Sequence, residues 1–443
     1  MRVFKDTYLT GRFFTCLLLG IFALVMAYVF PLLLIWVAGA LLMYAVMVLL
    51  ELITLYRYKQ GFEASRVVSD KLSNGEENPV RVEVRNRYPV GVHCRLIDEI
   101  PVEFQNRHIS FSLNMMPGEQ QGINYTLRPT KRGAYGFGKV RAFISTRLSL
   151  VERRYSFDLE REVAVYPSFM MMHRYELMAY GNYHPENGAM RTRALGGNMA
   201  FEQIKPYVVG DDPRTVNWKA TAKHNHLMVN TYTEERSQQI YCLADKGRTM
   251  QSPFNGMTML DHAINTILTL SNVILKKGDR AGLITFSNTS RNCVKADNRV
   301  GQLNRISEFL YRLETHYQES DFEKLYISVV RQIPTRSLLI LFTNFDTVTG
   351  MQRHLSALRR LASRHLVLIV LFENSELNKA LERPVRGVKD VYFETIAAGF
   401  AMEKRQMVRE LSQMGIRVIL SKPEALTVNS INSYLDLKER KLI

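Results

Sequence analysis

Residues 240–250 read Ile-Tyr-Cys-Leu-Ala-Asp-Lys-Gly-Arg-Thr-Met, and this stretch decides the fold of the C-terminal half. Its first five residues are typical of a buried strand, and the strand is predicted to end at Asp245. Gly247 and the hydroxyl of Thr249 follow at once. Polar groups just past the carboxyl end of a buried strand lie where open α/β sheets bind ligands. The stretch therefore predicts a strand-end site in an α/β domain.

Downstream of this stretch, predicted strands and helices alternate as far as the C-terminus. The predicted strands are 239–244, 281–286, 337–343, 366–372 and 416–420. Residues 338–342 and 366–371 are continuously apolar, as is typical of parallel strands covered on both faces. Apolar residues at helical spacing in 260–275 and 351–361 predict amphipathic helices between the strands. Residues 238–443 are therefore expected to form a doubly wound, mostly parallel sheet.

Residues 167–237 are expected to connect this domain to the rest of the chain. Their most distinctive part is 196–223, which reads GGNMAFEQIKPYVVGDDPRTVNWKATAK. Gly210-Asp-Asp-Pro213 has the composition of a turn, because Asp side chains accept backbone hydrogen bonds and proline presets φ. Asp212 or Thr215 is expected to cap a short helix that carries Trp218 and Lys219.

Two interpretations of this block stay open. In the first it is a structural clasp, with Trp218 buried and Arg214 paired with Asp211 or Asp212. In the second it is a surface that binds a partner. The candidate partner-binding residues of this block are Asp211, Asp212, Arg214, Trp218 and Lys219. Two cations of the strand-end loop, Lys246 and Arg248, are further candidates.

Residues 59–166 have the pattern of a small antiparallel β-sandwich. Short segments with an apolar residue at every second position predict half-buried strands. These segments are 80–85, 92–96, 108–113 and 123–127. Asn74-Gly75, Pro117-Gly118 and the glycine at 133 separate them as turns. The single histidines His93 and His108 are expected to face solvent.

The N-terminal segment is expected to be a membrane hairpin within residues 1–58. Residues 13–50 carry no charged side chain. As one helix they would extend ~57 Å, nearly twice the ~30 Å hydrocarbon core of a membrane. Pro31 lies near the middle and predicts a break, so two spans of about 13–29 and 32–55 are expected, with Glu51 near the interface.

The charges that flank the hairpin predict its orientation. Arg2, Lys5 and Arg12 precede the first span, and Arg57 and Lys59 follow the second. Basic flanks favour the cytoplasmic side, so both termini and all the globular domains are expected to be cytoplasmic, anchored in the inner membrane. The net charge of +16 is spread along the chain without long like-charged runs, which argues against a nucleic-acid partner. The four cysteines lie far apart, without the close pairs of a zinc or disulfide framework.

The pattern Gly-Asp-Asp-Pro-Arg-x-x-x-Trp-Lys at 210–219, followed by a strand ending in Asp245, resembles the domain of unknown function 58 family. The resemblance covers most of the chain. Asn217 stands where the family usually has Asp, and Lys223 where it often has Arg. The resemblance implies a C-terminal half similar to von Willebrand factor A-type (VWA) domains. It also implies that the protein acts together with MoxR-type AAA+ ATPases and other VWA proteins.

A VWA metal site opens with Asp-x-Ser-x-Ser and takes further ligands from two later loops, and this chain departs from that pattern. The first loop offers Asp245 and Thr249 but has Gly247 in place of a hydroxyl. The second loop offers Ser320 and Asp321, and the third has Asn344 where Asp is expected. Because Mg²⁺ requires a near-octahedral set of oxygen ligands, we expect at most weak Mg²⁺ binding. The alternative is that Asp245 and Ser320 or Asp321 form a hydrogen-bonded clasp, or that Lys246 or Arg248 replaces the charge of the metal.

Two functions from different classes follow from these observations. The first is a non-enzymatic, membrane-anchored adaptor without catalytic residues or a bound cofactor, which works with a MoxR-type ATPase in protein assembly or envelope maintenance. The second is a membrane-bound, metal-dependent hydrolase that uses Asp211, Asp212, Asp245 and Asp321. The missing ligands at 247 and 344 favour the adaptor. Motifs for nucleotide binding or a nucleophilic serine are absent from the sequence.

Overall fold

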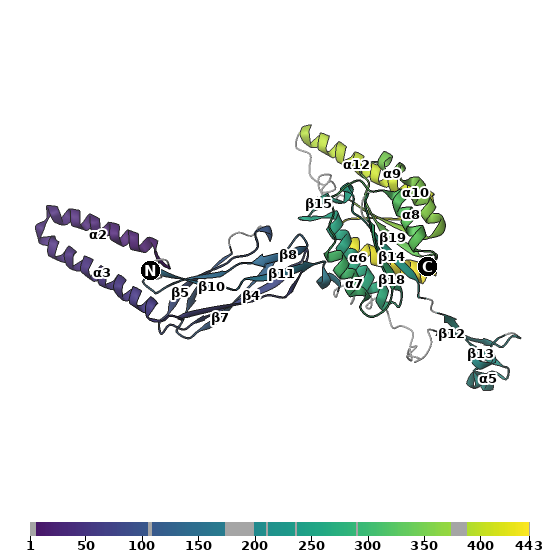
Figure 1. The fold of residues 1–443 in the computed structure, drawn as a ribbon, viewed down its shortest axis with the longest axis horizontal. Helices are drawn as coiled ribbons and strands as arrows, with labels where there is room; N and C mark the ends of the chain where they lie inside the picture. The colour runs from purple at the N-terminus through teal and green to yellow at the C-terminus, as the bar shows by residue number, and fades with distance from the viewer. Residues whose placement is uncertain are drawn as a thin grey trace. The chain divides into compact units, whose positions relative to one another are not determined.

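The computed structural model describes residues 6–104, 109–172, 199–209, 211–234, 237–288, 291–373 and 388–442. The chain divides into two compact units, Met1–Met170 and Met171–Ile443 (Figure 1). The predictions for Arg2, Lys5, His108 and Gly210, and for residues 173–198, lie outside the described residues.

Two apolar helices form a hairpin at one end of the first unit (Figure 1). Helix α2 spans Gly11–Val29, and α3 spans Leu34–Arg57. A short 3-10 turn at Pro31–Leu33 separates them, which confirms the predicted break at Pro31. Both helices are long and apolar enough to cross a membrane, judged by length and composition.

The β domain of the first unit consists of three sheets. A five-stranded sheet has the order β1-β10-β9-β5-β6, and three-stranded sheets have the orders β2-β4-β7 and β3-β11-β8. Their bounds are β1 Thr7–Leu9, β2 Phe62–Val67, β3 Lys71–Ser73, β4 Asn78–Asn86, β5 Val92–Asp98, β6 Ser110–Met115, β7 Gln120–Leu127, β8 Gly133–Phe137, β9 Val140–Ser145, β10 Val151–Phe157 and β11 Arg161–Tyr166. The predicted strands are present, and Gly75 and Gly118 adopt the positive φ of the predicted turns. The pairing is antiparallel except between β3 and β11.

The core of this domain lies between the five-stranded sheet and the sheet of β2, β4 and β7. Val82 and Val84 of β4 share one buried apolar cluster with Cys94 and Leu96 of β5, and Leu55 of α3 joins it. The alternation of buried and exposed residues along β4 and β5 produces this arrangement, because successive side chains of a strand point to opposite faces. The C-terminal end of α3 is therefore packed onto the β domain.

A six-stranded sheet forms the centre of the second unit, in the order β18-β17-β14-β19-β20-β21. The strands are β14 Gln239–Asp245, β17 Arg280–Phe286, β18 Arg291–Asp297, β19 Leu338–Phe342, β20 Leu366–Phe372 and β21 Arg417–Ser421. Five are parallel, as predicted, and β18 adds an antiparallel edge that the sequence did not predict. Numbered from β14, the order is 3-2-1-4-5-6, which is that of doubly wound sheets.

Helices cover both faces of this sheet (Figure 1). Cys242 and Ala244 of β14 face a core shared with α6, α7 and α13, while Tyr241 and Leu243 face a core shared with α8, α9, α10 and α12. The helices are α6 Met259–Lys276, α7 Gln302–Tyr311, α8 Phe322–Gln332, α9 Val348–Gln352, α10 Leu355–Arg364, α12 Val388–Gln413 and α13 Leu426–Glu439. The two apolar faces of each central strand explain why its sequence is continuously apolar.

The connector contains a β-hairpin of β12, Met199–Pro206, and β13, Met228–Glu234. Helix α5, Trp218–His224, lies between the two strands in sequence, as predicted. The prediction that Asp212 or Thr215 caps this helix is wrong: the Asn217 side chain caps α5 by accepting a hydrogen bond from Ala220 N at 3.0 Å, and Asp212 caps the 3-10 turn Pro213–Thr215. The prediction of a buried Trp218 is wrong, since this side chain is 72% exposed. Two strands and a two-turn helix offer too little apolar surface to enclose an indole.

Candidate functional site at the strand ends

The candidate site lies where β14 and β19 end side by side. After β14 the chain continues to β17 on one side of the sheet, and after β19 it continues to β20 on the other side. The carboxyl ends of two such strands border the crevice in which open α/β sheets bind ligands. A cavity of about 370 Å³ opens there. Four of the five predicted metal-site residues line it, namely Asp245, Thr249, Ser320 and Asn344.

Asp245 is almost fully buried at the end of β14 and is held by three donors. Its Oδ1 accepts hydrogen bonds from Gly247 N at 2.8 Å and from the hydroxyl of Ser320. Its Oδ2 accepts a hydrogen bond from Thr343 Oγ1 at 2.6 Å. Burial raises the pKa of this carboxyl, and the three hydrogen bonds act in the opposite direction. The expected clasp between Asp245 and Ser320 is therefore present.

Gly247 makes this clasp possible because it has no side chain. A Cβ at this position would overlap Ser320 Oγ and lie 3.0 Å from Asp245 Oδ1. The serine of the full Asp-x-Ser-x-Ser pattern therefore cannot be accommodated here unless Ser320 moves. Ser320 supplies a hydroxyl from another loop in its place.

Asn344 is bound by a lysine that the sequence analysis did not single out. Lys404 of α12 donates to Asn344 Oδ1 and to Phe345 O, both at 2.5 Å. Burial lowers the pKa of Lys404 to about 8, while Asp346 and Glu403 act in the opposite direction. Lys404 is therefore mainly protonated at neutral pH, and it places a positive charge beside the third predicted loop.

Asp321 lies near the site but has a different role. It caps α8 by accepting a hydrogen bond from Lys324 N at 2.9 Å. Burial opposes the ionisation of Asp321, but its hydrogen bonds from Lys324 outweigh this effect and lower its pKa. The helix predicted to begin at Phe322 is present.

The rim of the cavity carries charges of both signs. Arg248 and Arg353 are exposed, and neither has an ion-pair partner within the described part of the chain. The carboxylates of Glu319 and Asp346 also line the cavity. The rings of Phe322 and His354, whose centroids are 4.5 Å apart, form part of the wall.

Lys246 is not on this rim, and the expectation that it offers an exposed charge there is wrong. The residue is only 3% exposed and lines a different cavity, together with Arg305 and Arg312. Its N–H donates to Phe286 O at 3.0 Å, which prolongs the pairing of β14 with β17 beyond Asp245. Successive side chains of a strand point to opposite faces, so the Lys246 side chain points away from the face on which Asp245 lies. Burial lowers the pKa of Lys246.

The candidate residues of the connector lie within the β-hairpin and do not line the strand-end cavity. Asp211 accepts hydrogen bonds from Val208 N and from Lys205 Nζ, both at 3.0 Å, and these contacts lower its pKa. Asp212 accepts a hydrogen bond from Arg214 N at 2.9 Å. Among the described residues no ion pair joins the Arg214 guanidinium to Asp211 or Asp212, so that predicted pairing is wrong; Lys205 provides the cation for Asp211, and only the backbone N–H of Arg214 contacts Asp212.

The four aspartates of the hydrolase alternative are not gathered at one site. Asp211 and Asp212 form the turn of the β-hairpin, Asp245 lies in the strand-end cavity and Asp321 caps α8. Among the described residues, no group of three His, Cys, Asp or Glu side chains is placed to hold a metal ion.

Thr343 and Lys404 are the site residues that sequence reasoning missed. Thr343 directly follows β19, so its position beside a strand end was a usable signal. Lys404 lies within a long helix and carries no local signal, because only tertiary packing brings it to Asn344.

Comparisons with known proteins agree with the sequence resemblance. Residues 203–388 match the family model described as "Protein of unknown function DUF58". The chain is 23% identical over 244 residues to the uncharacterized protein YeaD of Bacillus subtilis (strain 168), a match that covers 53% of this chain and 58% of YeaD.

Two of the solved structures that match cover about a quarter of the chain. The CARDB domain of PF1109 from Pyrococcus furiosus is 16% identical with a TM-score of 0.18, covering 24% of this chain and 91% of that one. A PapD-like domain of human CEP192 is 13% identical with a TM-score of 0.18, covering 24% and 87%. Similarity at this level carries no inference about function. The family match and the relative together make residues 203–388 similar to the DUF58 family, in agreement with the resemblance noted in the sequence.

Proposed function

We propose that this protein is a membrane-anchored, VWA-like adaptor whose strand-end cavity binds a carboxylate-bearing partner without a metal ion. The partner we propose is a MoxR-type AAA+ ATPase, as the family resemblance implies, in protein assembly or envelope maintenance. The observation that supports the proposal is the contact of Lys404 with Asn344, since it holds a cation of the protein next to a residue of the strand-end cavity where the resemblance implies a metal ligand.

The exposed surface of α2 and α3 supports the membrane anchor. Leu18, Leu32 and Trp36 are 69%, 90% and 78% exposed, and the most apolar stretches of the two helices are almost unburied. A helix from the core of a soluble protein would bury such residues, because each large apolar side chain left in water costs about 1.5–3 kcal/mol. A lipid environment removes this cost. We further propose that both termini and the globular domains face the cytoplasm, as the basic flanks predict.

The fit of the site to Mg²⁺ is poor. A hard divalent cation requires several oxygen ligands in a near-octahedral array. Both carboxylate oxygens of Asp245 already accept hydrogen bonds, and the space of a hydroxyl at position 247 is taken by Ser320. The ammonium of Lys404 at 2.5 Å from Asn344 Oδ1 would repel a cation bound beside it.

The charges of the cavity support an acidic partner. Arg248 and Arg353 are exposed at its rim, and guanidinium groups form two-pronged hydrogen bonds with carboxylates. Asp346 and Glu319 make the rim mixed rather than uniformly basic, but Lys404 offsets the charge of Asp346. We therefore propose that Arg248 and Arg353 make the ion pairs with the partner.

A copurification experiment tests the adaptor proposal. The full-length chain is coexpressed with the cognate MoxR-type ATPase, extracted from membranes in mild detergent and captured, and the bound ATPase is quantified. Arg248→Glu with Arg353→Glu is expected to abolish capture, because like charges facing each other across an interface cost several kcal/mol. Arg359→Glu is the matched control, since Arg359 is exposed on α10 and does not line the cavity. Unchanged capture by the double variant, with an unchanged melting temperature, would refute the proposed docking site.

A further inference from the structure

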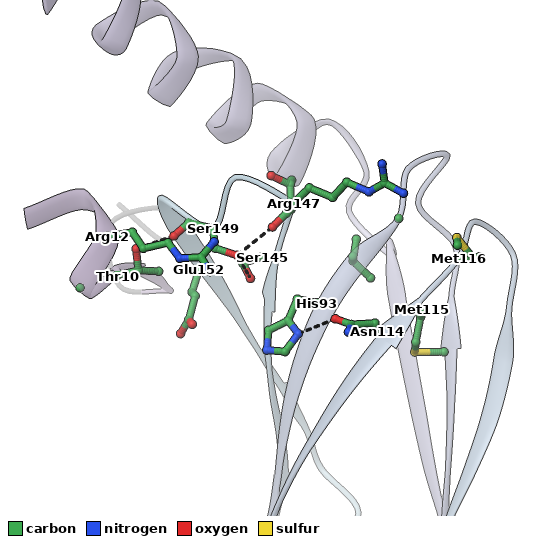
Figure 2. A pocket seen from close by; sticks show the side chains of 14 residues that line it. Thr10, Arg12, His93, Asn114, Met115, Met116, Ser145, Arg147, Ser149 and Glu152 are labelled. Carbon is green, nitrogen blue, oxygen red and sulfur yellow. Dashed lines mark hydrogen bonds between the residues drawn. The ribbon is translucent and has the colours of Figure 1, made fainter. Parts of the chain in front are cut away.

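We propose that a second cavity, at the helix-bearing end of the β domain, binds the phosphate headgroup of an anionic membrane phospholipid. The cavity has a volume of about 800 Å³ and lies wholly within the first unit (Figure 2). Its walls come from the start of α2, from β5 and β6, and from the loop between β9 and β10. The assignment rests on the membrane anchoring proposed above.

Both apolar helices are tied directly to the wall of this cavity. Thr10, which caps α2, donates to Ser149 O at 2.5 Å and to Leu150 O at 3.1 Å. Glu51 of α3 is 3% exposed and accepts hydrogen bonds from Thr146 Oγ1 at 2.5 Å and Leu150 N at 3.1 Å. The loop between β9 and β10 therefore holds the ends of both helices.

This attachment puts the cavity at the level of the lipid headgroups. Helix α2 has 19 residues and is therefore ~28 Å long, close to the ~30 Å of the hydrocarbon core. If α2 crosses the membrane, its first turn lies at the membrane–water boundary. Arg12 belongs to that turn, and it lines the cavity.

The side chains that line the cavity match an anion. Arg12 and Arg147 are exposed, and Figure 2 shows them at different sides of the cavity. Neither guanidinium has an ion-pair partner among the residues that the structure describes. The carboxylate at the wall, Glu152, is already bound by Arg95 at 3.0 Å. Two available guanidiniums next to a neutralised carboxylate favour a phosphate ligand.

Polar and apolar groups of the wall favour a lipid over free phosphate. His93 Nδ1 and Asn114 Oδ1 are 2.7 Å apart, which orients both side chains on neighbouring strands (Figure 2). Met116 lines the same cavity and is 61% exposed, so it offers apolar surface to a glycerol backbone or an acyl chain. A cavity of about 800 Å³ is far larger than one phosphate ion requires. The cytoplasmic leaflet supplies anionic lipid at high local concentration.

The test is a lipid titration of the purified full-length chain in detergent, read by native mass spectrometry. Phosphatidylglycerol is the anionic probe, phosphatidylcholine the zwitterionic probe and inorganic phosphate the competitor. The test variant is Arg12→Gln with Arg147→Gln. Lys131→Gln is the matched control, because Lys131 is exposed and does not line the cavity. It follows the C-terminal end of β7, whereas the cavity residue Met116 precedes the N-terminal end of this strand.

We expect wild type and the Lys131 variant to bind phosphatidylglycerol alike, and the double variant to bind it about tenfold more weakly for each lost guanidinium. Arg147→Lys, which keeps the charge but not the two-pronged geometry, should fall between them. Equal binding of phosphatidylglycerol by the double variant would overturn the proposal. Equal affinity for both lipids, or full displacement by low millimolar phosphate, would also overturn the lipid assignment.

Carbonate extraction of cell membranes separates this proposal from the membrane anchor. Wild type and all variants are expected to stay in the membrane pellet, because the substitutions leave the apolar residues of both helices unchanged. Release of the wild type from the membrane would refute the proposed membrane anchor. The titration in detergent measures lipid binding to the cavity and does not depend on membrane retention. A wild type that stays in the membrane pellet but shows no preference for phosphatidylglycerol in the titration would refute this inference and leave the anchor standing.

Discussion

Ser320 donates a hydrogen bond to Asp245 across 75 positions of sequence, and it occupies the space that a side chain on Gly247 would need. A strand end, a glycine and a hydroxyl from another loop thus form one clasp. The glycine that departs from the metal-binding pattern is the residue that the clasp requires. Each of the predictions on the strand-end site depends on this arrangement or on the cation beside it.

Restoring the metal-binding pattern by Gly247→Ser should destabilise the protein. The new side chain would force Ser320 away from Asp245, and overpacking of this kind typically costs about 1–3 kcal/mol. Chemical denaturation of the purified chain measures the change. Adding Ser320→Gly should recover part of the loss. Gly399→Ser is the control, because a Cβ there meets no atom within 4 Å. Equal effects of the two glycine substitutions would contradict the steric argument.

Millimolar Mg²⁺ should leave the thermal stability nearly unchanged. A ligand that binds only the folded state at 100 times its Kd adds about 2.7 kcal/mol, which a melting curve resolves easily. We expect no such shift between about 5 mM MgCl₂ and excess EDTA, and no stoichiometric binding by calorimetry, since Asp245 is already engaged. Tight binding that disappears in Asp245→Ala would show that the clasp opens to take a metal.

The stability should rise with pH through the titration of Lys404. Its pKa is lowered to about 8 in the folded chain from 10.5, so between these values the unfolded state binds more protons. The free energy of unfolding therefore increases from about pH 8 to about pH 10.5, by at most about 3 kcal/mol. Denaturation of wild type and Lys404→Met across this range measures the difference. A difference that is flat with pH would mean that Lys404 titrates normally.

Charge reversal at Lys246 should destabilise the protein strongly, whereas charge reversal at Arg248 should hardly change its stability. Lys246→Glu puts a carboxylate where the side chain is 3% exposed, and a buried unpaired charge is among the most destabilising substitutions known. Arg248→Glu is at an exposed position and should change the free energy of unfolding by no more than about 0.5 kcal/mol. Thermal melts of the two variants decide the matter. Similar melting temperatures would contradict the burial of Lys246.

The orientation of the anchor can be tested by cysteine labelling in intact cells. Gln251 is exposed in the second unit, so Gln251→Cys offers a site for a membrane-impermeant maleimide. We expect no labelling beyond that of the parent chain until the cells are permeabilised, because two spans leave the globular domains on the cytoplasmic side. Labelling in intact cells would place these domains outside and reverse the proposed topology.

The secondary structure was predictable wherever the signal is local. The strand that ends at Asp245, the break at Pro31 and the short helix that carries Trp218 each depend on residues that are neighbours in sequence. The antiparallel edge strand β18 escaped prediction. Its sequence, Arg-Asn-Cys-Val-Lys-Ala-Asp, carries few apolar residues, and charged residues are common in edge strands, where they prevent pairing with further strands.

The candidate site was predictable in its position but not in its chemistry. By itself the sequence determined that Asp245, Ser320 and Asn344 follow or flank the strands of a parallel sheet, because the period of apolar residues specifies the strands and their ends. Only the tertiary structure decided that Ser320 fills the space over Gly247, that Lys404 reaches Asn344, that Lys246 is buried and that Trp218 is exposed. These four outcomes depend on which surfaces meet. Contacts between residues far apart in the chain leave no periodic trace in the sequence around either residue.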